Sequence, residues 1–139
     1  LAAGQTYDLY NSNPPTSGPH APQRAEWGVL DEPIPREVPV HNMEHGGVVI
    51  WYNCSAGDAP LDNEQCKQLR DQLAAITEGA LAEEKPVLML PYPDIETRIV
   101  LTAWRTLDAF NEFDGARVQA FIDSYELRFN PERLRGLGE

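Results

Sequence analysis

The sequence contains little positive charge and no long apolar run. Its 139 residues include 11 Lys and Arg against 22 Asp and Glu, so the formal net charge is -11. A nucleic-acid-binding domain normally presents a basic surface, and an anionic membrane surface repels an acidic domain. We therefore expect neither as a partner. No stretch reaches 18 consecutive apolar residues, so this sequence contains no membrane-spanning helix. Its length suits a single domain, residues 1–139, with a core of its own.

Cysteine is also scarce, and the two copies are placed for a disulfide. Cys54 and Cys66 flank a polar, turn-forming segment, and their spacing matches neither a CxxC redox motif nor a zinc clip. We expect a structural disulfide that contributes about 3 kcal/mol, with two separate buried thiols as the alternative. A disulfide would indicate an oxidising, extracytoplasmic compartment.

The first residue, Leu1, is not a methionine. This start indicates either that a targeting segment was removed or that the boundary is arbitrary. Under the first interpretation, we expect membrane contact only through a removed N-terminal anchor.

Proline divides the chain near residue 46. Seven of the 12 prolines precede this point, and each fixes φ and removes a backbone donor. We therefore expect residues 1–45 to form an irregular arm that wraps on a regular core at residues 46–139. The seven are Pro14, Pro15, Pro19, Pro22, Pro33, Pro35 and Pro39.

The core has the periodicities of strands and helices. Apolar runs predict three strands, at 48–52, 86–90 and 98–104. Apolar stripes predict two helices, one capped by Asp62 with Gln65 as its capping-box partner, and one capped near Asp114 and ending before Pro131. The buried stripes comprise Cys66, Leu69, Leu73, Ile76 and Ala80, then Val118, Phe121, Ile122, Tyr125 and Phe129.

The predicted order is strand, helix, strand, strand, helix. A strand-helix-strand unit implies a parallel crossover, and the turn at residues 91–97 implies an antiparallel addition. The sequence therefore predicts an α+β fold, with a small mixed sheet covered by two helices. This is a reduced thioredoxin-like layout without a CxxC motif. The three tryptophans, Trp27, Trp51 and Trp104, are expected in the core.

The segment from Val40 to Gly47 concentrates side chains that bind metals. His41 and His45 are two of the three histidines, and Met43 is one of two methionines. On an extended backbone alternate side chains share a face, so these three would project together. Two imidazoles and a thioether favour copper, especially Cu(I).

Two further residues are candidate ligands of this site. His20, in a proline-stiffened loop, is expected to complete it, and Met89 is a candidate because its strand should lie beside the strand at 48–52. Gly46 and Gly47 would permit a bulge or a close backbone approach beside the metal. We therefore predict an extracytoplasmic copper-binding protein, a carrier, buffer or metallochaperone with a delivery or acceptor protein as partner, rather than an enzyme.

Two alternatives stay open. On a helix, His41, Glu44 and His45 match H-x-x-E-H, the motif of inverted zinc peptidases, with zinc as cofactor and Glu44 activating a bound water. Pro39 before the motif and Gly46-Gly47 after it argue against a helix there. In the other alternative, the histidines bind no metal and hold the proline-rich arm in place.

Several motifs resemble one bacterial family. They are the segments 11–20 (NSNPPTSGPH), 27–28 (WG), 31–35 (DEPIP) and 41–48 (HNMEHGGV). On these residues the chain resembles the family called domain of unknown function 3105, from about Tyr10 through the C-terminal helix. The resemblance implies a secreted or membrane-anchored protein, often preceded by one transmembrane helix, and it implies no particular activity.

Overall fold

One five-stranded mixed sheet organises the part of the chain that a computed structural model describes, residues 12–18, 20–57 and 59–126. The strand order is β1-β3-β2-β4-β5. Strands β1 and β2 both run parallel to β3, whereas β4 is antiparallel to β2 and β5 is antiparallel to β4. The elements are β1 (Gly28–Val29), α1 (Glu37–Glu44), β2 (Val48–Tyr52), α2 (Asn63–Ala82), β3 (Val87–Pro91), β4 (Ile99–Ala103), β5 (Thr106–Phe110) and α3 (Gly115–Tyr125).

Strand β2 is the centre of the sheet. Each of its five residues is buried, because β3 and β4 flank the strand and both faces of the sheet are covered. A continuous apolar run is typical of such a strand, and the prediction at residues 48–52 is confirmed. In register, Ile50 lies opposite Met89 of β3 and Leu101 of β4.

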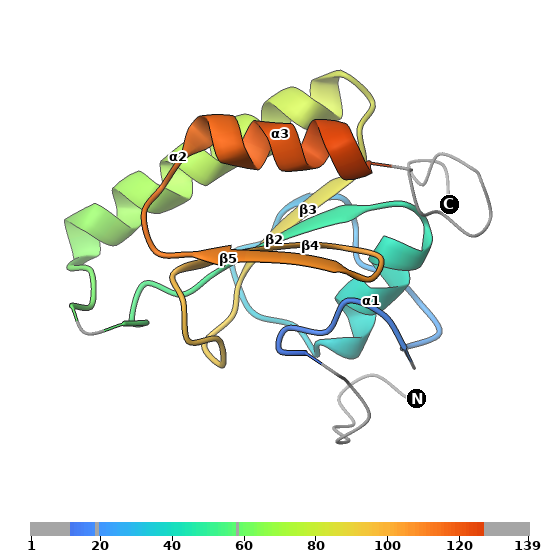
Figure 1. Cartoon of the computed structure of the whole chain (residues 1–139), viewed down its shortest axis with the longest axis horizontal. Helices are drawn as coiled ribbons and strands as arrows, with labels where there is room; N and C mark the ends of the chain where they lie inside the picture. Colours follow the sequence, from blue (N-terminus) through green and yellow to red (C-terminus); the bar gives the residue numbers. More distant parts are fainter. Residues whose placement is uncertain (1–11, 19, 58, 127–139) are drawn as a thin grey trace.

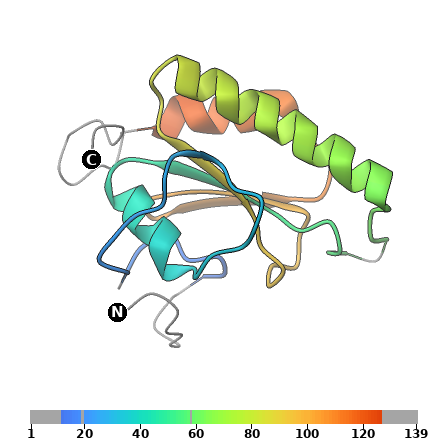
Figure 2. The same ribbon diagram turned by 180° about the vertical axis from the view of Figure 1, so that it is seen from behind.

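The sheet separates two hydrophobic clusters. Helices α2 and α3 cover one face, and the shorter α1 lies on the other (Figures 1 and 2). Alternate residues of β2 serve the two sides, since Ile50 packs with the α2 and α3 cluster and Trp51 with the α1 cluster. The α1 cluster also includes Trp27 and Trp104 as partly buried members.

The α+β fold is as predicted, but three elements within it were not. Strands β1 and β5 lengthen the sheet at its two edges, and α1 falls inside the arm that we expected to be irregular. The turn at residues 91–97 does lead into an antiparallel strand. That strand, β4, joins β2 because β1 pairs with the other edge of β3.

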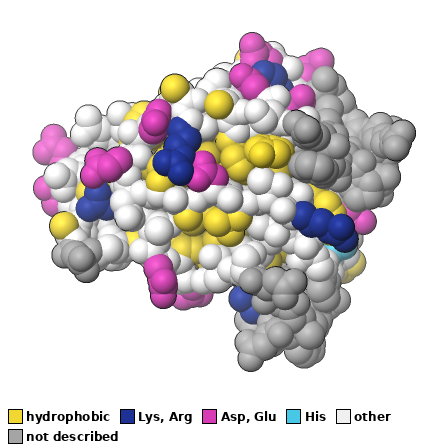
Figure 3. All heavy atoms as spheres, in the orientation of Figure 1, with side chains coloured by type: hydrophobic (Ala, Val, Ile, Leu, Met, Phe, Trp, Pro, Cys, Tyr) yellow, Lys and Arg dark blue, Asp and Glu magenta, His cyan; other side chains and the backbone are white. Residues whose placement is uncertain are grey.

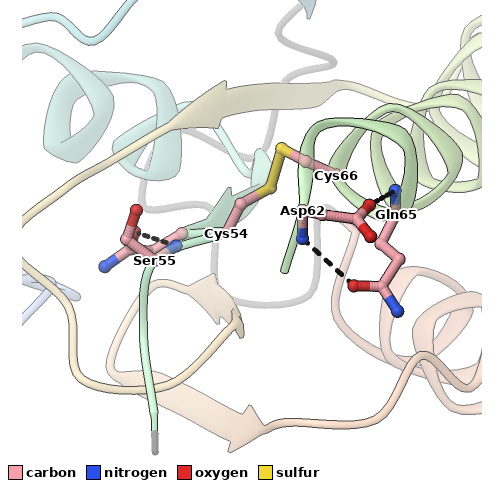
Figure 4. The surroundings of a disulfide bond; sticks show 6 residues. Cys54, Ser55, Asp62, Gln65 and Cys66 are labelled. Carbon is pink, nitrogen blue, oxygen red and sulfur yellow. Dashed lines mark hydrogen bonds between the residues drawn. A yellow bond between two sulfur atoms is a disulfide. The ribbon is translucent and has the colours of Figure 1, made fainter. Parts of the chain in front are cut away.

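The predicted disulfide joins the end of β2 to the first turns of α2 (Figure 4). Cys54 is bonded to Cys66, with their Cα atoms 5.6 Å apart. Beside it, the Asp62 carboxylate accepts from the Gln65 backbone N–H at 2.7 Å, and the Gln65 side chain accepts from the Asp62 N–H at 3.0 Å. This is the capping box predicted from the sequence.

Helix α3 begins as predicted. The Asp114 carboxylate accepts from the backbone N–H of Arg117 at 3.1 Å, which makes it the N-cap. Val118, Phe121 and Ile122 form the buried face, and Phe129 and Pro131 lie outside the described residues.

The surface has mixed charge on the face seen in Figure 3. Acidic side chains are interspersed there with single basic ones, and hydrophobic side chains form a band across the middle. None of the helices in the described residues combines the length and the apolar character needed to span a bilayer.

The first prediction concerns the disulfide. Replacing both Cys54 and Cys66 by Ser should lower the free energy of unfolding by about 3 kcal/mol, because the bond closes a short loop in the unfolded chain. Urea unfolding measures the change. A reducing agent should lower the stability of the native protein by a similar amount and leave the double variant unchanged. Equal stability of the two proteins without reductant would contradict the expectation.

Candidate metal centre

All three histidines of the chain meet beside the C-terminal end of α1. His41 lies in its last turn, His45 is its C-cap, and His20 comes from the segment that precedes α1. From here on, the arm means the described part of that segment, residues 12–18 and 20–36. The Nε2 atoms of His41 and His45 are 3.0 Å apart, and their rings stack at a centroid distance of 4.9 Å. The His20 ring meets the His41 ring edge-on, 5.0 Å between centroids.

The prediction of an extended backbone at residues 41–45 is wrong, and the reason lies at the two ends of α1. Pro39 occupies the first turn, where a missing N–H costs nothing because it would have no helical partner. At the other end Gly46 adopts a φ of 85°. Its N–H donates to the Met43 carbonyl at 2.9 Å, and the N–H of Gly47 donates to the Asn42 carbonyl at 3.1 Å. These two bonds form a Schellman motif, a regular way to end a helix.

Gly47 fixes the position of this helix end against the rest of the fold. A Cβ atom there would lie 2.4 Å from two ring atoms of Trp27 and 2.8 Å from the Asn42 carbonyl oxygen. Such contacts are too short for any side chain, so the position requires glycine. A group therefore does approach the backbone closely at Gly47, and that group is the Trp27 ring.

Hydrogen bonds hold the arm along α1. Ala21 donates its N–H to the Glu37 carbonyl at 3.1 Å and accepts from His41 Nδ1 at 2.9 Å. Asn42, fully buried, pairs with both backbone groups of Ala25: its Oδ1 accepts from the N–H at 2.9 Å, and its Nδ2 donates to the carbonyl at 3.0 Å. These contacts place His20 beside His41. Asn42 was not among the predicted site residues. Its position on a helix is the feature that would have pointed to its role.

The backbone contacts orient two of the rings. A carbonyl oxygen only accepts, so His41 Nδ1 carries the proton that it donates to Ala21. The same holds for His20, whose Nδ1 lies 3.0 Å from the Gly18 carbonyl. In both rings Nε2 is then the atom that can coordinate a metal, and such second contacts are typical of metal-binding histidines. The Nε2 of His20 lies 2.5 Å from the Glu44 carboxylate.

The structure brings neither methionine to the histidines. Met43 is fully buried in the cluster that also contains Val40 and Trp51, because residues two positions apart on a helix face in nearly opposite directions. Met89 belongs to the other cluster, across the sheet from α1. Within the described residues, no group of three or more His, Cys, Asp or Glu side chains is arranged to hold a metal ion as it stands.

Comparison with known proteins gave one match. The family model described as "Protein of unknown function (DUF3105)" matches residues 5–135. No curated protein and no solved structure matches the chain.

The second prediction tests how the arm is held. Replacing Asn42 by Ala removes two hydrogen bonds and leaves the half-buried N–H of Ala25 without its acceptor, so the unfolding free energy should fall by about 2 kcal/mol. Amide hydrogen exchange at residues 20–30 should accelerate. Asn53→Ala is the matched control, since Asn53 makes the same kind of bonds to Ser55 and Ile95 in another loop. If both variants change exchange in the arm equally, Asn42 has no special role there.

Proposed function

The chain belongs to the family described as protein of unknown function (DUF3105), and we propose that it is an extracytoplasmic copper-binding protein. The observation that carries the proposal is the convergence of all three histidines, with the Nε2 atoms of His41 and His45 at 3.0 Å. His41 and His45 are the primary ligands. His20 is the third ligand, and Glu44 a carboxylate within reach of the same ion.

The distance between the two nitrogens favours some metal geometries over others. With metal–nitrogen bonds of about 2.0 Å, cis positions of a square-planar ion are about 2.8 Å apart and tetrahedral positions about 3.3 Å. Linear coordination, common for Cu(I), needs about 4.0 Å. The 3.0 Å separation between His41 and His45 lies between the first two values. It supports Cu(II) first and Zn(II) second.

The ligand atoms support the same choice. The preference for Cu(I) rested on thioethers, and both methionines are buried away from the histidines. Imidazole and carboxylate remain, and such N and O donors bind Cu(II) most tightly among the divalent first-row ions. For His20 to coordinate the metal ion, its Nε2 must move away from the Glu44 carboxylate. The ion then replaces the proton that His20 and Glu44 share.

The environment of the site suits a carrier or buffer. The side chains of His20 and Glu44 are 25% and 29% exposed, so an ion held there is accessible to a delivery or acceptor protein. The Cys54–Cys66 disulfide supports a compartment outside the cytoplasm, secreted or at the outer face of a membrane.

A zinc-dependent hydrolase is the second candidate. One observation favours it: residues 41–44 are helical with His45 as C-cap, so the spacing of an H-x-x-E-H site is realised on one face. Glu44 would act as the base, but it is paired with His20. Peptide hydrolysis by the zinc-loaded protein, lost in Glu44→Gln, would favour this candidate over copper carriage.

The third prediction tests the copper site. Titration of Cu(II) into the metal-free protein against a competing chelator should show one tight site, and His41→Ala or His45→Ala should weaken it at least 100-fold. His20→Ala should weaken it less, because a two-nitrogen site survives. Met43→Leu is the matched control on the same helix and should leave the affinity unchanged.

The outcome that contradicts the proposal is also specific. If the histidines only fasten the arm, His41→Ala lowers the melting temperature, and the native protein shows no copper affinity beyond that of the variant. If Met43→Leu weakens binding as strongly as His41→Ala, the ligand set is wrong.

A further inference from the structure

A second candidate site lies at the opposite end of α1 from the histidines. A pocket of about 520 Å³ opens there between the loop before α1 and the loop after β3. Its volume is within the range of sites for small molecules. Apolar walls come from Ile34, Pro35 and Tyr92, and charged groups from Arg36, Glu37 and Asp94.

The unusual feature of this pocket is the Glu37 carboxylate. Glu37 belongs to the lining although none of its surface is exposed, so it forms the inner wall. Neither of its carboxylate oxygens has a hydrogen-bond partner within the described residues. A buried carboxylate without a donor is costly, and such groups often mark a site where a ligand supplies the missing partner.

Two polar side chains that line the pocket donate hydrogen bonds to groups other than Glu37. Arg36 donates a hydrogen bond to the Tyr92 hydroxyl, and burial raises the pKa of Tyr92, so the hydroxyl stays protonated. At the rim, the Asn13 amide donates to the backbone carbonyl of Asp94 at 2.6 Å. The donor that Glu37 lacks is therefore one that a ligand can bring.

We propose that this pocket binds a small organic ammonium ion with an apolar body. The ammonium group donates to Glu37, and the apolar part packs against Ile34, Pro35 and the Tyr92 ring. Asp94 adds a second negative charge to the lining, and a cation near the Tyr92 ring gains a cation–π contact. Because the carboxylate is covered, binding displaces the side chains around it, and Arg36 and Tyr92 respond together with Glu37.

This site is separate from the proposed copper site. Glu37 is the first residue of α1 and His45 its C-cap, so the two sites occupy opposite ends of the helix. The proposal stands whether or not the histidines bind copper.

The experiment compares two probes of the same shape and different charge. Phenethylammonium and neutral 2-phenylethanol are titrated into the ¹⁵N-labelled full chain, followed by amide chemical shifts. We expect shifts at residues 34–37 and 92, and at least tenfold tighter binding of the amine than of the alcohol. This comparison needs no variant, and equal binding of the two probes would overturn the proposal.

Two variants locate the charge. Glu37→Gln keeps the shape of the side chain and should weaken binding of the amine at least tenfold, while Glu32→Gln, at an exposed carboxylate nearby, should not. Because it removes an unpaired buried charge, Glu37→Gln should be at least as stable as the native protein in thermal unfolding. A clear loss of stability would mean that Glu37 already has an internal partner, and the site would be withdrawn. Copper affinity of the variant should be unchanged.

Discussion

The turn at Gly46 and Gly47 is the constraint on which the rest of this face of the molecule depends. It ends α1, and β2 begins at the residue after Gly47. The helix and the central strand are therefore connected by this turn, with no further loop between them. The Trp27 ring occupies the space that a side chain at Gly47 would need. The position of His45 follows from this turn, because it is the last residue before it.

The position of the arm depends in turn on α1. Proline-rich segments form few hydrogen bonds among themselves, so the arm needs acceptors and donors from elsewhere. Helix α1 supplies them through the Glu37 carbonyl, His41 Nδ1 and the Asn42 side chain. The arm in return brings His20 to the end of the helix. One helix of eight residues therefore carries two candidate sites, one at each end. The arm contributes residues to both sites, so its packing against α1 determines which side chains each site contains.

Local signals in the sequence were sufficient for the elements after residue 46 other than β5. The run Val48–Tyr52, the capping box at Asp62 and the cysteine spacing each determine a structure by contacts close in sequence, and the structure has all three. Strand β5 was missed because an edge strand, half exposed, has only a weak alternating pattern. Helix α1 was missed because Pro39 and Gly46 were weighed as breakers. At the first turn and just past the last residue, they are signals that a helix starts and stops.

This one error changed the chemistry expected of the site. The predicted convergence of His41 with His45 is present in the structure, but through a helical spacing of four residues instead of an extended spacing of two. The same change of geometry carries Met43 into the core, where it is buried in the same cluster as Trp51. The strand of Met89 was placed correctly beside β2, but the Met89 side chain lies on the face of the sheet away from α1. Side chains alternate between the two faces along a strand, so the face of Met89 could be predicted only if the face of one other residue of the strand were known. The residues of the candidate site were therefore more predictable than its ligand atoms.

The distribution of tryptophan has a practical consequence for spectroscopy. Trp27, Trp51 and Trp104 are the three tryptophans of the chain, and all belong to the cluster on the α1 side of the sheet. Emission from the protein thus reports on one half of its core, the half that adjoins the arm and the histidines. The half beneath α2 and α3, which the disulfide adjoins, is followed optically by circular dichroism of the helices instead. A difference between the two signals during unfolding would separate loosening of the arm from melting of the fold.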